Sequence, residues 1–145
     1  MSHNPTEIKI ASKTVKENFD LVKKIVNLNI TTYISLGMVE DNFFPFENNN
    51  NIKYLWCKST YPNDIDDIKL LPKNFNESNY YGFSDHFVGI EAALIAITRG
   101  ANLVEKHFTL DKSDQTIRDH VCSATPAEFK LLVDHGKIIH NMLYK

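Results

Sequence analysis

The sequence predicts an α/β fold in which helices cover a parallel sheet of about five strands. Short β-rich segments alternate with amphipathic helical segments along the 145 residues. The strand segments are apolar on both faces, which is typical of parallel strands buried between layers. With 43% hydrophobic and 23% charged residues, the chain is expected to form one domain with a sizeable core. The alternation alone does not decide between a barrel and an open sheet.

Five segments have the composition of strands, and a helix fits between most of them. The expected strands are residues 7–12, 31–35, 52–59, 80–84 and 101–108. Apolar residues at helical spacing predict helices over residues 18–28 and 89–99, and Gly100 stands where a helix C-cap is expected. Residues 39–51 combine phenylalanines, a proline and an asparagine run, which predicts a turn or loop rather than a full helix.

The last helix is expected to begin after Thr125, a suitable N-cap. Pro126 follows at the first helical position and Glu128 at the third, as in a capping box. The helix should run to about Met142. Its predicted apolar stripe consists of Phe129, Leu132, Val133 and Ile139.

Composition and charge argue against several classes of protein. The formal net charge is −2 and no long basic run occurs, so no nucleic-acid partner is expected. No apolar stretch reaches the roughly 20 residues that span a bilayer, so no membrane association is expected. The first six residues lack the features of a signal peptide. Cys57 and Cys122 lack CxxC spacing, which favours free thiols in a reducing cytoplasm.

Polar residues recur where the expected strands end. They are Lys9, Ser12, Ser35, Lys58, Ser59, Ser84, Asp85, His86, Glu105, Lys106 and His107. In parallel α/β folds these ends converge on one rim, where functional groups collect. Serine hydroxyls beside a lysine suit an anionic ligand, although serine is also favoured in turns. The recurrence across strands, rather than any single serine, therefore indicates phosphate or carboxylate binding.

His86 and His107 follow consecutive expected strands. One crossover helix fits the 21 positions between them. Because adjacent strands lie about 4.8 Å apart, two imidazoles at neighbouring strand ends can reach one metal ion. Such a site would leave coordination positions for water and substrate. The alternative is that each histidine satisfies a local hydrogen bond at the rim.

Two strings in the sequence identify a family resemblance. YGFSDHFVGIEAA at residues 81–93 and GANLVEKHFTLD at residues 100–111 resemble segments of N-acetylneuraminate synthases and related nonulosonic acid synthases. Further matches run from Lys9 to Phe129, so the resemblance covers nearly the whole chain. It implies the C-terminal part of the catalytic (β/α)8 barrel, without the antifreeze-like domain that follows in that family.

The resemblance also implies a reaction. Proteins of that family condense phosphoenolpyruvate with an N-acetylated amino sugar aldehyde, such as N-acetylmannosamine, and release phosphate. A divalent metal, Mn²⁺ or Mg²⁺, polarises the aldehyde, and His86 and His107 resemble its ligands. The positions that resemble phosphoenolpyruvate-binding residues are Lys9, Ser12, Ser35 and Ser84, with Ser59 in place of an asparagine. Tyr61 and Asp119 resemble residues that hold the sugar.

Several departures from the family pattern are evident. Lys13 and Thr14 stand where the family commonly has Gly-Glu, and Trp56 replaces a histidine. A closed barrel takes about 250 residues, and the family's first three strands precede the segment matched here. Three arrangements are therefore expected: a fragment of a longer protein, one half of a split enzyme that pairs with a missing N-terminal half, or a homodimer of half-barrels. The alternative is a catalytically inactive remnant or partner subunit that retains metal or ligand binding.

Overall fold

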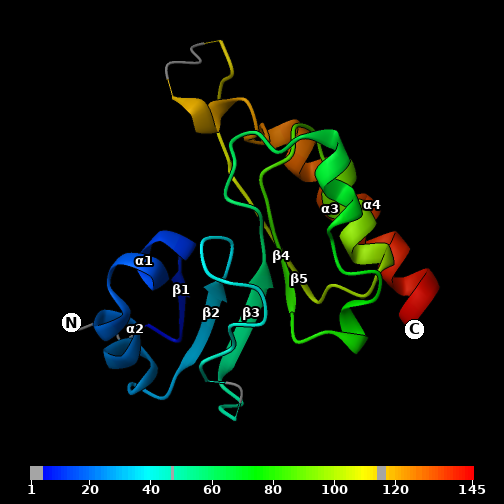
Figure 1. Ribbon diagram of the computed structural model, residues 1–145. Coiled ribbons are helices and arrows are strands. Elements are labelled where there is room, and N and C mark those ends of the chain that lie inside the picture. The colour runs from blue at the N-terminus through cyan, green and yellow to red at the C-terminus, as the bar shows by residue number, and fades with distance from the viewer. Residues whose placement is uncertain (1–4, 47, 114–116) are drawn as a thin grey trace.

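The computed structural model describes residues 5–46, 48–113 and 117–145 and contains one parallel sheet. Its strands are β1 (Glu7–Ile10), β2 (Thr31–Ser35), β3 (Ile52–Trp56), β4 (Gly82–Asp85) and β5 (Leu103–Lys106). They are hydrogen-bonded in sequence order, each parallel to the next (Figure 1). The predicted parallel α/β sheet is confirmed, because every connection returns to the same end of the sheet.

Three strands end earlier than predicted. The first ends at Ile10, and Ser12 instead begins helix α1 (Ser12–Glu17), so its placement in a strand was wrong. The Ser12 hydroxyl accepts a hydrogen bond from the Gly37 N–H and so lies against the loop after β2. After Trp56, the chain leaves the ladder because Asn63 binds the carbonyl oxygens of Lys58 and Thr60. Side-chain bonds thus replace strand pairing at this rim.

The three predicted helices are confirmed with small changes of length. They are α2 (Phe19–Val26), α3 (Glu91–Thr98) and α4 (Pro126–Tyr144). Gly100 has a φ of 90° after α3, which is the left-handed conformation expected of a C-cap glycine. Thr125 and Glu128 form the predicted capping box at the start of α4. The described part of residues 39–51 contains no helix or strand, as predicted.

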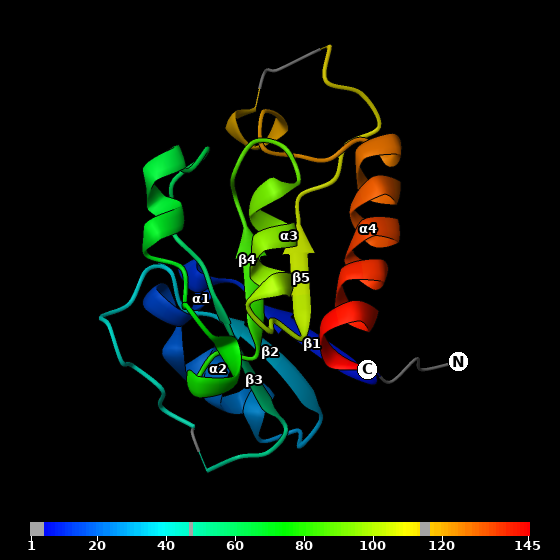
Figure 2. The same ribbon diagram turned by 90° about the vertical axis from the view of Figure 1, so that its right-hand side faces the viewer.

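The apolar stripe of α4 differs from the prediction. Leu132 is buried, but Val133 is 37% exposed and the second buried position is Gly136. A Cβ at Gly136 would lie 2.8 Å from Ile97 Cδ1, so this glycine permits a close approach of α4 to α3. Figure 2 shows the two helices side by side along β4 and β5. Tertiary packing against α3, rather than hydrophobicity alone, determines which face is buried.

The sequence did not predict the three short 3₁₀ helices. They are η1 (Ile65–Lys69), η2 (Phe75–Glu77) and η3 (Arg118–His120). The η1 helix has its own capping box, formed by Asp64 and Asp67. Asp67 also forms an ion pair with Lys58. Of the helices in the described ranges, none is long and apolar enough to cross a membrane.

Two apolar clusters hold the helices on the sheet. One packs α1 and α2 against the first three strands and includes Val22 and Ile34. The other surrounds Phe83 of β4 and includes Phe75 and Ala96. The sheet curls strongly, because Lys9 of β1 reaches Glu105 of β5 across three intervening strands, with N–O distances of 2.9 and 2.7 Å. The architecture is therefore a half-barrel whose concave face carries this ion pair.

Candidate active site

A cavity of about 190 Å³ lies at the carboxyl ends of the strands, where polar residues were predicted to converge. Seven predicted site residues line it: Lys9, Ser12, Ser35, Tyr61, Ser84, His86 and His107. All five strands or the loops directly after them contribute to the wall. Side chains two positions apart on a strand lie on the same face of the sheet, so Ser84 and His86 both reach the cavity, as do Glu105 and His107.

The serines of the cavity differ in their hydrogen bonding. Ser12 Oγ lies 2.9 Å from the Gly37 nitrogen and 3.1 Å from Cys57 Sγ. Ser84 donates to the Glu105 carboxylate at 2.7 Å. Ser35 is 2% exposed, and its hydroxyl has no hydrogen-bond partner in the part of the chain that the structure describes. A buried hydroxyl without a partner is costly, so Ser35 is the position in this cavity most suited to receive a ligand oxygen.

Glu105 belongs to the cavity but was not predicted as a site residue. It accepts two hydrogen bonds from Lys9 and one from Ser84. Desolvation works to raise the pKa of Glu105, but the Lys9 ammonium and the Ser84 hydroxyl hold it below its ordinary value. The signal was present in the sequence, because Glu105 lies two positions before His107 and therefore faces the same side of its strand.

The two predicted metal ligands lie next to each other. The ring centroids of His86 and His107 are 5.3 Å apart, and Tyr61 stands 4.2 Å from the first ring and 5.8 Å from the second. His86 Nδ1 lies 2.9 Å from the Lys58 carbonyl oxygen, so Nδ1 carries the hydrogen and Nε2 has a free lone pair. Desolvation lowers the pKa of His86, which favours this neutral form.

This donor set fits a metal ion that takes few protein ligands. Within the described ranges, no group of three or more His, Cys, Asp or Glu side chains is placed to hold a metal. A neutral imidazole whose Nδ1–H is bound to a carbonyl is, however, the usual form of a metal-ligating histidine. With two imidazole ligands, either predicted ion, Mn²⁺ or Mg²⁺, would take its remaining ligands from oxygen atoms of water or substrate.

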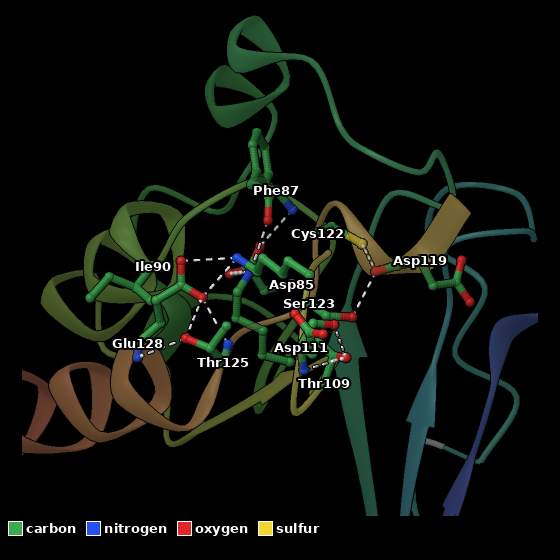
Figure 3. A network of polar contacts seen from close by, with 12 residues as sticks. Asp85, Phe87, Ile90, Thr109, Asp111, Asp119, Cys122, Ser123, Thr125 and Glu128 are labelled. Carbon is green, nitrogen blue, oxygen red and sulfur yellow. Dashed lines mark hydrogen bonds and ion pairs between the residues drawn. The ribbon is translucent and has the colours of Figure 1, made fainter. Parts of the chain in front are cut away.

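Ser59 and Asp119 do not line the cavity. Ser59 lies just behind its wall, with Oγ 3.8 Å from Cys57 Sγ. Asp119 is on η3, beyond β5, where its carbonyl oxygen accepts hydrogen bonds from Cys122 and Ser123 (Figure 3). The roles predicted for Ser59 and Asp119 remain predictions, because the structure does not bring these side chains to the rim occupied by the others.

The curled parallel sheet and the polar cavity at the carboxyl ends of its strands place this chain in the class of parallel α/β barrel proteins. Comparison with known proteins agrees, and the chain belongs to the NeuB family, which it matches over residues 1–145. A crystal structure of N-acetylneuraminic acid synthetase from Leptospira borgpetersenii, solved with citrate, superimposes with a TM-score of 0.83 and 28% identity. That match covers 97% of this chain and 52% of the other.

Curated relatives support the same family. N-acetylneuraminate-9-phosphate synthase of Drosophila melanogaster is 38% identical over 136 residues, which are 86% of this chain and 36% of the relative. Pseudaminic acid synthase of Campylobacter jejuni is 36% identical over 144 residues, 90% of this chain and 40% of the relative. The chain thus spans less than half the length of these relatives. The predicted family resemblance is confirmed.

Proposed function

We propose that this chain supplies the later strands of a synthase that condenses phosphoenolpyruvate with an N-acetylated amino sugar aldehyde to form a nonulosonic acid. Relatives that make sialic and pseudaminic acids support the product class. The observation that carries the proposal is the buried Ser35 hydroxyl, which lacks a partner in the described residues and faces a cavity beside Lys9. Phosphate or carboxylate oxygen would complete its hydrogen bonding.

In this proposal the serines and Lys9 hold the enol phosphate, while Tyr61 and the histidines face the sugar. The positive charge of Lys9 is already balanced by Glu105 in the half-barrel. A ligand with both a phosphate and a carboxylate therefore needs at least one further cation. We infer that this cation comes from the family's first three strands, and we therefore expect the 145 residues alone to bind the anion weakly.

His86 and His107 would hold the divalent metal, Mn²⁺ or Mg²⁺. When bound, such an ion would supply Lewis-acid polarisation of the sugar aldehyde. The chain's own contribution is to keep His86 neutral through burial, to direct its Nδ1–H to the Lys58 carbonyl, and to orient both rings against Tyr61. Three residues of the cavity wall, Ser35, Ser84 and His86, are nearly fully buried.

Completion of the barrel is part of the proposal. β1 and β5 each have one neighbouring strand in the described residues, so each leaves an edge open. Beside β5, a groove of about 570 Å³ between the sheet and α4 is lined by apolar residues such as Leu103, Val104 and Phe129. We propose that a polypeptide carrying the family's first three strands fills these edges, in the cytoplasm, where the free Cys57 and Cys122 remain reduced. A second copy of this chain is the alternative occupant.

The test is reconstitution. Phosphate release from phosphoenolpyruvate and N-acetylmannosamine should be absent for the purified chain with Mn²⁺. It should appear when a separately expressed N-terminal half of the Campylobacter jejuni pseudaminic acid synthase is added with that enzyme's own amino sugar, and His107→Ala should abolish it. Binding of the two halves without turnover would favour the inactive partner subunit. Turnover by the chain alone would contradict the need for further strands.

A further inference from the structure

Behind the candidate metal ligands lies an ion pair that the proposed chemistry does not use. Lys106 Nζ is 2.9 Å from Asp85 Oδ2, and the two side chains are 1% and 0% exposed. Each also binds the backbone of Phe87: Asp85 Oδ1 accepts from the Phe87 N–H at 2.8 Å, and Lys106 donates to the Phe87 carbonyl at 2.8 Å. Figure 3 shows Asp85 and Phe87 joined in this way.

The ion pair has a fixed relation to the two histidines. Asp85 and Lys106 are register partners on β4 and β5, and each directly precedes a histidine. Because side chains alternate along a strand, the pair lies on the face opposite to that of His86 and His107. It clamps the chain on both sides of His86, whose own carbonyl accepts from the Asn63 N–H at 2.9 Å. The pair thus fixes the backbone directly after His86 and joins the two strand residues that precede the histidines.

Stability does not account for this pair. Both side chains are almost completely removed from water, and this desolvation costs free energy that their mutual attraction need not repay. Replacing a buried ion pair with apolar residues of similar volume is often neutral or stabilising. What apolar residues lack is the ability to bind the Phe87 N–H and carbonyl at once. The pair is thus explained by geometry it imposes rather than by stability.

We propose that Asp85 and Lys106 are positioning residues that fix His86 and His107 at the spacing needed to share one metal ion. This inference rests on the proposed metal role of the histidines. Asp85 and Lys106 also border the cavity. In this proposal they act on the histidines through the backbone rather than as metal ligands.

The test uses the double variant Asp85→Leu/Lys106→Met in the full chain, with urea unfolding and circular dichroism to establish that it is folded. The expected result is a dissociation constant for Mn²⁺, measured by electron paramagnetic resonance, that rises about 10-fold to 100-fold, as for other residues that orient metal ligands. Asp85→Asn is the second variant, since it retains the side-chain shape and an acceptor for Phe87. It should weaken Mn²⁺ binding to a smaller extent.

A matched control removes another ion pair without touching the histidines. Lys112→Met/Glu128→Gln breaks the contact of Lys112 with α4 and should leave Mn²⁺ affinity within twofold. Wild-type affinity for Mn²⁺ in a folded Asp85→Leu/Lys106→Met variant would overturn the inference.

The tautomer of His86 tests the positioning role of Asp85 and Lys106 independently of metal binding. In wild-type chain without metal, ¹⁵N spectra of the imidazoles should show His86 as a single Nδ1–H tautomer, because Nδ1 donates to the Lys58 carbonyl. The double variant should show a second tautomer. If His107→Ala binds Mn²⁺ as well as wild type does, the metal role fails, and the tautomer result still decides whether the pair positions His86. Identical imidazole spectra would refute it.

Discussion

Replacing Ser35 by alanine should separate the stability of the chain from its capacity to hold an anion. Removing a buried hydroxyl that has no partner in the described residues relieves a desolvation cost of about 1–3 kcal/mol. Allowing for lost packing, we expect the free energy of unfolding to rise by about 1 kcal/mol, which corresponds to a melting temperature about 2–4 °C higher for a chain of this length. Urea unfolding and calorimetry measure both quantities.

Ser12→Ala is the matched control, because this serine lines the same cavity but is fully engaged. Its loss leaves the Gly37 N–H without its acceptor, which should lower stability by about 1–3 kcal/mol. The greater helix propensity of alanine at the start of α1 offsets roughly 0.5 kcal/mol of this. The two substitutions, chemically identical, are thus expected to shift the urea midpoint in opposite directions.

Anion affinity is a second property that the Ser35 substitution should change. If Ser35 binds a phosphate or carboxylate oxygen, Ser35→Ala should weaken phosphoenolpyruvate binding about 10-fold to 100-fold, the worth of one hydrogen bond to a charged group. Isothermal titration calorimetry with the reconstituted barrel measures this. A Ser35→Ala variant that is less stable than wild type, or that binds phosphoenolpyruvate equally well, would refute the role assigned to the unpartnered hydroxyl.

Two further predictions concern the scaffold. Gly82→Ala should cost about 1–3 kcal/mol or more, because the added Cβ would press against the carbonyl group of Leu103 on the neighbouring strand; an unchanged urea midpoint would contradict this register. The pKa of Glu128 is about 2 rather than 4.5, chiefly through its hydrogen bond from Lys112. The contribution of ionised Glu128 to the free energy of unfolding is therefore present above about pH 4.5 and is lost as the pH falls toward 2. Because the ion pair of Glu128 with Lys112 is partly exposed, we expect this contribution to be about 1 kcal/mol or less. The free energy of unfolding of Glu128→Gln should therefore change less with pH than that of the wild type.

The sequence predicted the parts of the fold that depend on local periodicity. The capping box at Thr125 and the C-cap at Gly100 are short-range signals, and both are present. The segment between β3 and β4 was not predicted, because its 3₁₀ helices are held by side-chain contacts such as that of Asp67 with Lys58 rather than by a repeating apolar pattern.

For the site, the parallel topology was enough to bring His86 and His107 together, since both follow neighbouring strands. The contact of Glu105 with Lys9 was not predicted, because Lys9 comes from the far side of the sheet. Only the curl of the sheet brings those two side chains into contact, and curl is a property of all five strands that no single segment encodes.

The contact between Lys9 and Glu105 joins residues 96 positions apart in the sequence. Closing so long a loop is entropically costly and comes late in folding, after the local strand and helix units have formed. The wall of the cavity is therefore incomplete until the last strand has docked. During synthesis, the nascent chain would hold no assembled ligand site until β5 and His107 had left the ribosome, so ligand capture would report on a fully paired sheet.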